Sequence, residues 1–286
     1  MLLNVSHLRV AFRIDGRLSV PVRDVSFAVP EGGRVALVGE SGCGKSLTAL
    51  SLGGLVDRAE ITGEITGSPR IAYIFQNPMQ SLNPVLRVGR QIAEAIPKKP
   101  QTSQLLNLST SQLLSQVGLP PGTERKYPCE MSGGQQQRVM IAMALAAEPD
   151  LLIADEPTTA LDVTTQREVL DLIERVATAR GMAVLFITHN LGLVARYSRT
   201  VNVMYAGEIV EHGDVVAVLK SPRHPYTKGL IAAVPDISAP KDAPLADIPG
   251  TVPPPWDWPS GCAFHPRCPH AVPACSESSL CPFMKD

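Results

Sequence analysis

The feature that most constrains this chain is a glycine-rich loop, Gly39–Ser46, with the sequence GESGCGKS. Its first glycine ends the apolar stretch RVALVG, and a helical pattern follows its serine. Such glycines let backbone N–H groups wrap a polyphosphate, while the helix N-terminus behind them adds positive potential. In this pattern Lys45 reaches the β- and γ-phosphates and Ser46 binds Mg²⁺. The loop therefore predicts a nucleoside triphosphate site rather than a surface turn.

The rest of the chain alternates between strand-like and helix-like patterns. Residues 151–154 and 183–188 are apolar runs that end at polar residues, and residues 165–180 repeat apolar side chains at helical spacing. Alternation of this kind predicts an α/β fold with a parallel sheet. The first 30 residues instead alternate as half-buried antiparallel strands do. Residues 78–148 carry no strand pattern and are expected to form an inserted helical segment.

A second motif, Asp155-Glu156, follows the apolar run LLIA. The strand delivers Asp155 to its polar end, where a carboxylate can hold Mg²⁺ through its hydration shell. The adjacent Glu156 can then polarise a water for in-line attack on the γ-phosphate. Alone the pair is common in solvated loops, but paired with the phosphate loop it predicts nucleotide hydrolysis.

The third motif points to a family. Met131-Ser132-Gly133-Gly134-Gln135 precedes a long helical run and closely resembles the LSGGQ signature of ABC-type ATPases, with Met131 where leucine is usual. Its serine and glycines form a second phosphate-binding device at a helix N-terminus. The resemblance implies that this device faces the nucleotide of a partner chain. It also implies an ABC ATPase fold with an antiparallel β lobe, a helical subdomain and an irregular C-terminal extension rich in Cys and Pro.

Further positions match the family's motifs in order. The resemblance implies catalytic roles for Glu156, for the switch histidine His189, and for the Q-loop glutamine Gln76, which also contacts Mg²⁺ with Ser46 and Asp155. The D-loop is matched by residues 159–162, and Phe12 matches the aromatic residue that stacks on adenine, although core packing is an equal alternative for it. The implied nucleotide contacts are Phe12, Gly39, Ser41, Gly42, Cys43, Gly44, Lys45, Ser46, Leu47, Ser132, Gly133, Gly134, Gln135 and Asp162.

The C-terminal part narrows the resemblance. Residues 224–227 (HPYT), 248–253 (IPGTVP) and 261–269 (GCAFHPRCP) are similar to the C-terminal region of the peptide/nickel importer ATPases. We expect a nucleotide-binding domain over residues 1–234 and an importer-type extension over 235–286, with Trp256 and Trp258 pinning the extension to the domain. The implied function is ATP-driven uptake of di- or oligopeptides, with nickel or metal-chelate import as the alternative.

Four cysteines crowd the extension: Cys262, Cys268, Cys275 and Cys281. Stable disulfides are disfavoured in a reducing cytosol, so metal binding is the better interpretation. The spacing is wider than that of zinc pairs, and four thiolates also suit a [4Fe–4S] cluster, which some members of the peptide importer family carry at this tail. An iron–sulfur cluster, zinc and no metal all remain open.

Composition excludes other classes and sets the expected partners. A net charge of −1 and 5% aromatic residues argue against a nucleic-acid-binding protein, and so against a DNA- or ribosome-acting ABC ATPase. Glu156 and His189 argue against a nucleotide-gated regulator with little turnover. The longest apolar run, nine residues from Val139, is too short to cross a bilayer, and no signal peptide is visible.

We therefore expect a peripheral subunit on the cytoplasmic face of the membrane. The resemblance implies ATP and Mg²⁺ as cofactors and two transmembrane permease subunits as partners. It also implies a second ABC ATPase chain, as a heterodimer or homodimer, and an extracytoplasmic substrate-binding protein.

Overall fold

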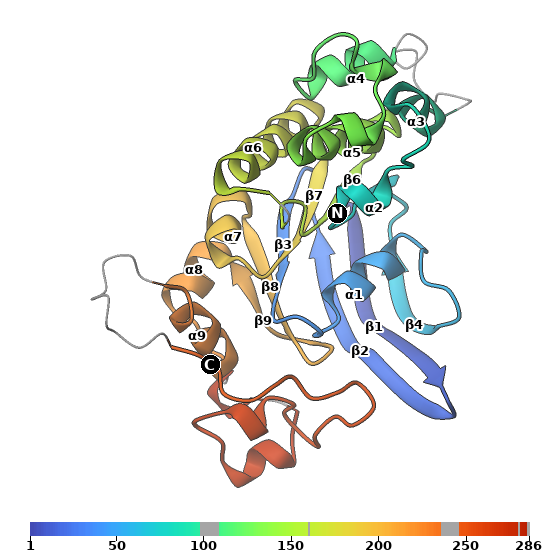
Figure 1. The fold of residues 1–286 in the computed structure, drawn as a ribbon. Helices are drawn as coiled ribbons and strands as arrows, with labels where there is room; N and C mark the ends of the chain where they lie inside the picture. Colours follow the sequence, from blue (N-terminus) through green and yellow to red (C-terminus); the bar gives the residue numbers. More distant parts are fainter. Residues whose placement is uncertain (98–108, 160, 236–245, 280, 285–286) are drawn as a thin grey trace.

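The computed structural model describes residues 1–97, 109–159, 161–235, 246–279 and 281–284 (Figure 1). The strands are β1 (Leu3–Ile14), β2 (Arg17–Val29), β3 (Arg34–Val38), β4 (Glu60–Thr66), β5 (Ile71–Ile74), β6 (Leu151–Asp155), β7 (Ala183–Thr188), β8 (Thr200–Tyr205) and β9 (Glu208–Asp214). The α-helices are α1 (Lys45–Leu52), α2 (Pro78–Ser81), α3 (Val88–Ala95), α4 (Thr110–Gln116), α5 (Gly133–Ala146), α6 (Val163–Arg180), α7 (Leu191–Tyr197), α8 (Val215–Lys220) and α9 (Pro225–Ala232). Short 3₁₀ turns are η2 (Thr123–Arg125), η3 (Pro128–Glu130), η4 (His265–Arg267), η5 (Pro273–Ser276) and η6 (Pro282–Met284).

The described strands form one sheet in the order β4-β1-β2-β9-β8-β3-β7-β6-β5. Strands β5, β6, β7, β3 and β8 are parallel neighbours, as the alternating sequence pattern predicted. Strand β1 pairs antiparallel with both β2 and β4, which confirms the antiparallel lobe. The parallel strands bring their carboxyl ends to one edge of the sheet, where the phosphate loop after β3 and the Asp-Glu pair after β6 both lie.

The central strands are buried on both faces. In β3, Val35 and Leu37 join the hydrophobic cluster beneath the antiparallel lobe and α1, while Ala36 and Val38 join the cluster beneath α7, α8 and α9. This is the two-residue alternation of a strand covered on both sides. A third cluster joins α5 and α6 to β5, β6 and β7.

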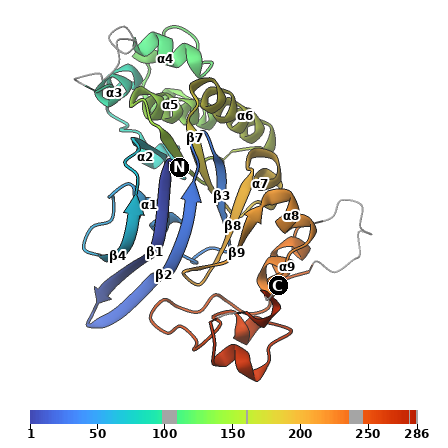
Figure 2. The ribbon, with the colours of Figure 1, turned by 180° about the vertical axis from the view of Figure 1, so that it is seen from behind.

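The segment 78–148, as far as it is described, is helical, as expected. Helices α3, α4 and α5 lie together at one end of the molecule, with α6 beside α5 (Figures 1 and 2). Part of this segment, residues 98–108, falls outside the described residues. Among the described residues, no helix combines the length and apolar character needed to span a membrane.

The C-terminal extension lies at the opposite end of the molecule from α3 and α4 in both ribbon views. It packs through Phe264, Cys262 and Cys275 into the cluster that also holds Tyr205 of β8 and Tyr226 of α9. Trp258 donates a hydrogen bond from Nε1 to the Val20 carbonyl of β2 at 2.8 Å, which confirms that it pins the extension. Trp256 does not serve this purpose, because its side chain is mostly exposed.

Candidate nucleotide site

The phosphate loop connects the end of β3 to the start of α1. Gly44, directly before the helix, adopts a left-handed conformation with φ of 100°. A Cβ on Gly39 would lie 2.1 Å from the Met204 carbonyl oxygen of β8, and one on Gly44 would lie 2.5 Å from the Pro21 carbonyl oxygen. The tight fit against β8 and β2 therefore requires glycine at both positions.

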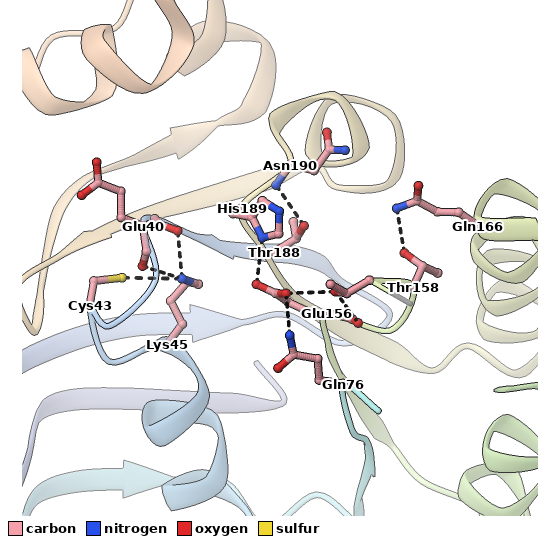
Figure 3. Close-up of polar contacts among 12 residues, drawn as sticks. Glu40, Cys43, Lys45, Gln76, Glu156, Thr158, Gln166, Thr188, His189 and Asn190 are labelled. Atoms are coloured by element: carbon pink, nitrogen blue, oxygen red, sulfur yellow. Dashed lines mark hydrogen bonds and ion pairs between the residues drawn. The ribbon is translucent and has the colours of Figure 1, made fainter. Parts of the chain in front are cut away.

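Lys45 is buried within this loop. Its Nζ donates hydrogen bonds to the carbonyl oxygens of Gly39 and Glu40, each at 2.8 Å, and lies 3.7 Å from Sγ of Cys43 (Figure 3). Burial raises the pKa of the Cys43 thiol despite the nearby ammonium group, so the thiol is neutral at physiological pH. The lysine thus points at the loop interior, where phosphates bind in this kind of loop.

Asp155, at the end of β6, meets the first residues of α1. Tyr73 of β5 donates a hydrogen bond to its Oδ2 at 2.9 Å, and the Ser46 side chain lies near enough to the carboxylate to lower its pKa. Burial raises the pKa of Asp155, and the neighbouring Ser46 and Tyr73 hydroxyls oppose the rise. The two side chains expected to hold Mg²⁺ on β6 and α1, Asp155 and Ser46, therefore lie together. Their oxygen donors are the ligand type that Mg²⁺ prefers, so the residues fit this ion.

The Glu156 carboxylate contacts side chains from three other positions in the chain (Figure 3). Its Oε1 lies 2.9 Å from Nδ1 of His189, which follows β7. Its Oε2 accepts hydrogen bonds from Nε2 of Gln76 at 3.1 Å and from the Thr159 hydroxyl at 2.9 Å. The three side chains expected to act in catalysis, from three separate parts of the sequence, are thus brought into direct contact.

Glu156 has an unusual backbone conformation and a carboxyl group with a lowered pKa. Its φ is 44°, which is rare for a residue with a side chain, and its N–H donates to the Ile187 carbonyl of β7 at 2.9 Å. Burial alone would raise the pKa of its carboxyl, but hydrogen bonds from His189 and Thr159, and the charges of His189 and Lys45, outweigh burial and lower it. The carboxylate is therefore ionised at neutral pH and available as a proton acceptor.

The signature residues lie at the N-terminus of α5. Ser132 is the N-cap and accepts a hydrogen bond from the Gln135 N–H at 3.3 Å, while the Gln135 side chain accepts from the Ser132 N–H at 3.1 Å. Gly133 packs against Leu161 of the D-loop, and Gly134 packs against Thr165 in the first turn of α6. The residues of the expected second phosphate-binding device are therefore separate from the loop around Lys45.

Two other expected nucleotide contacts have different environments. Asp162 is exposed and caps α6 by accepting hydrogen bonds from the Thr165 N–H at 3.0 Å and hydroxyl at 2.6 Å. Its D-loop neighbour Ala160 lies outside the described residues. Phe12 is half-buried on β1 and packs against the hydrophobic cluster beneath the lobe, so adenine stacking at Phe12 stays a prediction.

Sequence reasoning missed one support of the site and one contact of an expected D-loop residue. Tyr73 orients Asp155, and Thr159 of the D-loop orients Glu156. The signal for Tyr73 was its position on β5, the strand paired with β6, at the level of Ile153. Only the pairing of β5 with β6 reveals that neighbour relationship, because paired residues of the two strands are 80 positions apart in the sequence.

The four-cysteine segment does not form a ready metal site. Among the residues the structure describes, no group of three or more His, Cys, Asp or Glu side chains is arranged to hold a metal ion. Cys262 and Cys275 are instead buried in the cluster around Phe264. The expected iron–sulfur site is therefore not supported by the arrangement of these thiols.

A strand-loop-helix phosphate site, an Asp-Glu strand and a separate signature helix define an ABC-type ATPase. Comparison with known proteins agrees. The sequence model of the family described as ABC transporter matches residues 22–159, and that described as oligopeptide/dipeptide transporter, C-terminal region, matches residues 210–275. The dipeptide transport ATP-binding protein DppD of Escherichia coli (strain K12) is 45% identical over 96% of this chain and 90% of its own length. The chain therefore belongs to the ABC transporter family, as an ATP-hydrolysing subunit.

Solved structures share the fold. The ATP-binding cassette MJ0796, in a dimeric post-hydrolysis state bound to ADP and Pi, matches with a TM-score of 0.63 at 24% identity, over 75% of this chain and 99% of that chain. An inward-facing transporter described as of the metal-chelate type matches with a TM-score of 0.61 at 26% identity, over 76% and 85% of the two chains. The expected α/β fold of ABC ATPases is thus confirmed.

Proposed function

We propose that this chain is the ATP-hydrolysing subunit that drives uptake of di- and oligopeptides through a membrane ABC importer. One observation carries the cargo assignment: 45% identity over nearly the whole chain to a dipeptide transport ATP-binding protein, together with a matching oligopeptide/dipeptide C-terminal region. The metal-chelate alternative is weaker, because the structure described in that way is only 26% identical.

The residues of the site divide the chemistry among themselves. The loop Gly39–Ser46 binds the phosphates of ATP through its N–H groups, and Lys45 leaves its carbonyl partners to reach the β- and γ-phosphates. Ser46 and Asp155 hold Mg²⁺, which neutralises phosphate charge. Glu156 takes the proton from the attacking water, and Gln76 and His189 hold the carboxylate in place.

Two such chains act together in this proposal. The exposed N-terminus of α5, with Ser132 and Gly133, presents its N–H groups to the γ-phosphate held by the partner chain. A second ABC chain, identical or different, is required, because within one chain these residues pack on α6 rather than on the phosphate loop. ATP closes the pair and hydrolysis reopens it.

The proposed assembly also includes two permease subunits and an extracytoplasmic substrate-binding protein, with this chain on the cytoplasmic face. Reconstitution of that assembly in lipid vesicles tests the function. We expect ATP-dependent accumulation of a labelled dipeptide, abolished by Glu156→Gln and retained by Glu168→Gln, which changes an exposed carboxylate on α6. Accumulation of a nickel chelate without the dipeptide would favour the alternative cargo, and transport of neither would contradict an import role.

We also propose that the extension, residues 235–286, binds an iron–sulfur cluster through its four cysteines once these are brought together. The Cys262 N–H donates a hydrogen bond to the Cys275 carbonyl at 2.8 Å, and Cys268 packs against the hydrophobic cluster that holds both. Burial raises the pKa of the Cys262, Cys268 and Cys281 thiols, backbone hydrogen bonds oppose the rise, and the other cysteines of the set add to it. All four are free of disulfides.

Anaerobic purification tests this site. We expect bound iron, bound sulfide and an absorbance band at about 400 nm. The band should be lost in Cys268→Ser and kept in Cys129→Ser, because Cys129 lies outside the extension. Bound zinc in place of iron would assign the site to zinc. A colourless protein free of iron and zinc would reject a metal site.

A further inference from the structure

Glu40, the second residue of the phosphate loop, is held from three directions. Its carbonyl oxygen accepts from Lys45, its backbone N–H donates to the Tyr226 hydroxyl at 2.8 Å, and its carboxylate pairs with Arg267. The first of these contacts is within the loop itself. The other two come from residues nearly 190 or more positions later in the sequence, and neither belongs to a recognised nucleotide motif.

Arg267 makes a two-point contact with Glu40. Its two terminal nitrogens donate to the two carboxylate oxygens at 2.7 and 3.1 Å. The remaining donors reach the carbonyl oxygens of Pro249 at 2.8 Å and Ile248 at 3.1 Å, and the Tyr205 hydroxyl at 3.4 Å. The arginine side chain is only 6% exposed. All of its donor groups are therefore committed, and its charge is shielded from water, while the Glu40 carboxylate stays partly exposed.

The surroundings of Arg267 make this contact rigid. Its guanidinium lies 5.7 Å from the ring centre of Tyr205 and 6.0 Å from that of Phe264. Tyr205, Tyr226 and Phe264 pack on one another with ring centres 4.6 to 5.4 Å apart. Strand β8, helix α9 and the C-terminal extension thus form one packed unit behind the loop.

We propose that Arg267 and Tyr226 are positioning residues for ATP binding, so that the C-terminal extension is part of the nucleotide site of its own chain. The loop binds phosphate only while its N–H groups converge, and Glu40 fixes the loop where it leaves β3. Arg267 also neutralises a carboxylate that would otherwise place negative charge beside the phosphates.

The lysine contacts explain why the loop needs this second support. In the structure Lys45 holds the Glu40 carbonyl, but it must turn to the phosphates when ATP binds. The loop then loses that internal hydrogen bond. The contacts from Arg267 and Tyr226 do not involve Lys45, so they keep Glu40 in place both with and without bound ATP.

The test compares ATP affinity with turnover. We measure Kd for ATP with the purified full-length chain, and KM and kcat in the assembled importer. Arg267→Ala should raise Kd and KM about tenfold or more, the loss expected for a charge-assisted hydrogen bond, while kcat at saturating ATP stays within about twofold. Tyr226→Phe, which keeps the ring and removes only the hydroxyl, should raise both constants by a smaller factor.

A matched control separates positioning from stability. Arg34 starts β3 at the end away from the loop and is likewise largely buried, with an ion pair to Glu174 at 2.6 Å and carbonyl acceptors. Arg34→Ala should lower the melting temperature and leave Kd and KM unchanged. If Arg267→Ala does not fold, Arg267→Lys, which keeps the charge and loses the two-point contact, takes its place with a smaller expected rise.

The proposal is overturned if the Arg267 and Tyr226 variants keep the wild-type Kd and KM. It is equally overturned if their only change is a lower kcat that matches a smaller fraction of folded protein. It uses only ATP and does not depend on which cargo is transported. A failure of peptide uptake would therefore leave it standing, and its own failure would leave the peptide assignment untouched.

Discussion

Nδ1 of His189 lies 2.9 Å from Oε1 of Glu156, although 33 residues separate them. The contact exists because β6 and β7 are parallel neighbours that end at the same edge of the sheet. It joins the residue that follows each strand, and Gln76, after β5, completes the group from the next strand along. The order of the strands, rather than the length of chain between these residues, therefore assembles the hydrolytic centre.

Replacing Glu156 with glutamine should stop hydrolysis and preserve ATP binding. The amide has nearly the same shape but cannot accept a proton from water, and general-base catalysis is worth about two to four orders of magnitude in rate. We expect kcat to fall by that factor while Kd for ATP stays close to wild type. Phosphate release and equilibrium binding measure the two quantities. Full turnover in this variant would remove Glu156 from the catalytic role.

Gly134→Ala should destabilise the chain although alanine normally favours a helix. The new Cβ would lie 2.6 Å from Cγ2 of Thr165, so overpacking should cost about 1–3 kcal/mol. Thr165→Ser removes that methyl group and keeps the hydroxyl contact with Asp162, so it should relieve most of the loss. Gly133→Ala is the control, because its Cβ would meet only Leu161 at 3.4 Å. Urea unfolding of Gly134→Ala, of Gly134→Ala combined with Thr165→Ser, and of Gly133→Ala checks this prediction; equal losses for both glycine variants would argue against the clash.

His224 should make the fold less stable as the solution becomes acidic. Burial lowers the pKa of its ring to about 4, and its Nδ1 accepts the Tyr226 N–H at 3.1 Å, which requires the neutral form. Between about pH 6.5 and about pH 4 the unfolded chain binds a proton at this residue and the folded chain does not. The free energy of unfolding therefore decreases by up to about 3 kcal/mol as the pH is lowered through this range.

The matched variant for this prediction is His224→Asn, which keeps an acceptor at the N-cap of α9 and does not titrate in that range. Urea unfolding at several pH values should show a shallower acid loss for the variant. Identical pH profiles for the two proteins would assign the acid sensitivity to other groups.

Trp258→Phe should loosen the extension without unfolding the domain. The variant loses the hydrogen bond from Nε1 to the Val20 carbonyl, which is worth about 1 kcal/mol and corresponds to about fivefold more frequent local opening. Limited proteolysis should cleave the extension faster by a similar factor. Trp256→Phe is the control, since Trp256 is 59% exposed; equal acceleration by both variants would exclude the pinning role.

The sequence alone was sufficient for the fold class and for the nucleotide motifs. Patterns in β3, β6 and β7 are strong because these strands are covered on both faces and so read as continuous apolar runs. The loop Gly39–Ser46 is equally easy to recognise in the sequence, because only glycine fits the close contacts that Gly39 and Gly44 make with β8 and β2. Local constraints of this kind restrict the residue types at positions close together in the sequence, so they can be recognised there.

Only the tertiary structure decided which distant residues meet. It placed Arg267 and Tyr226 on Glu40, and Tyr73 on Asp155. It also buried Cys262 and Cys275 in the hydrophobic cluster around Phe264, although four cysteines crowded together in the sequence had predicted a metal site. A motif is a statement about residues close in the chain, whereas these contacts depend on strand order and on how the C-terminal extension packs, which spacing does not encode.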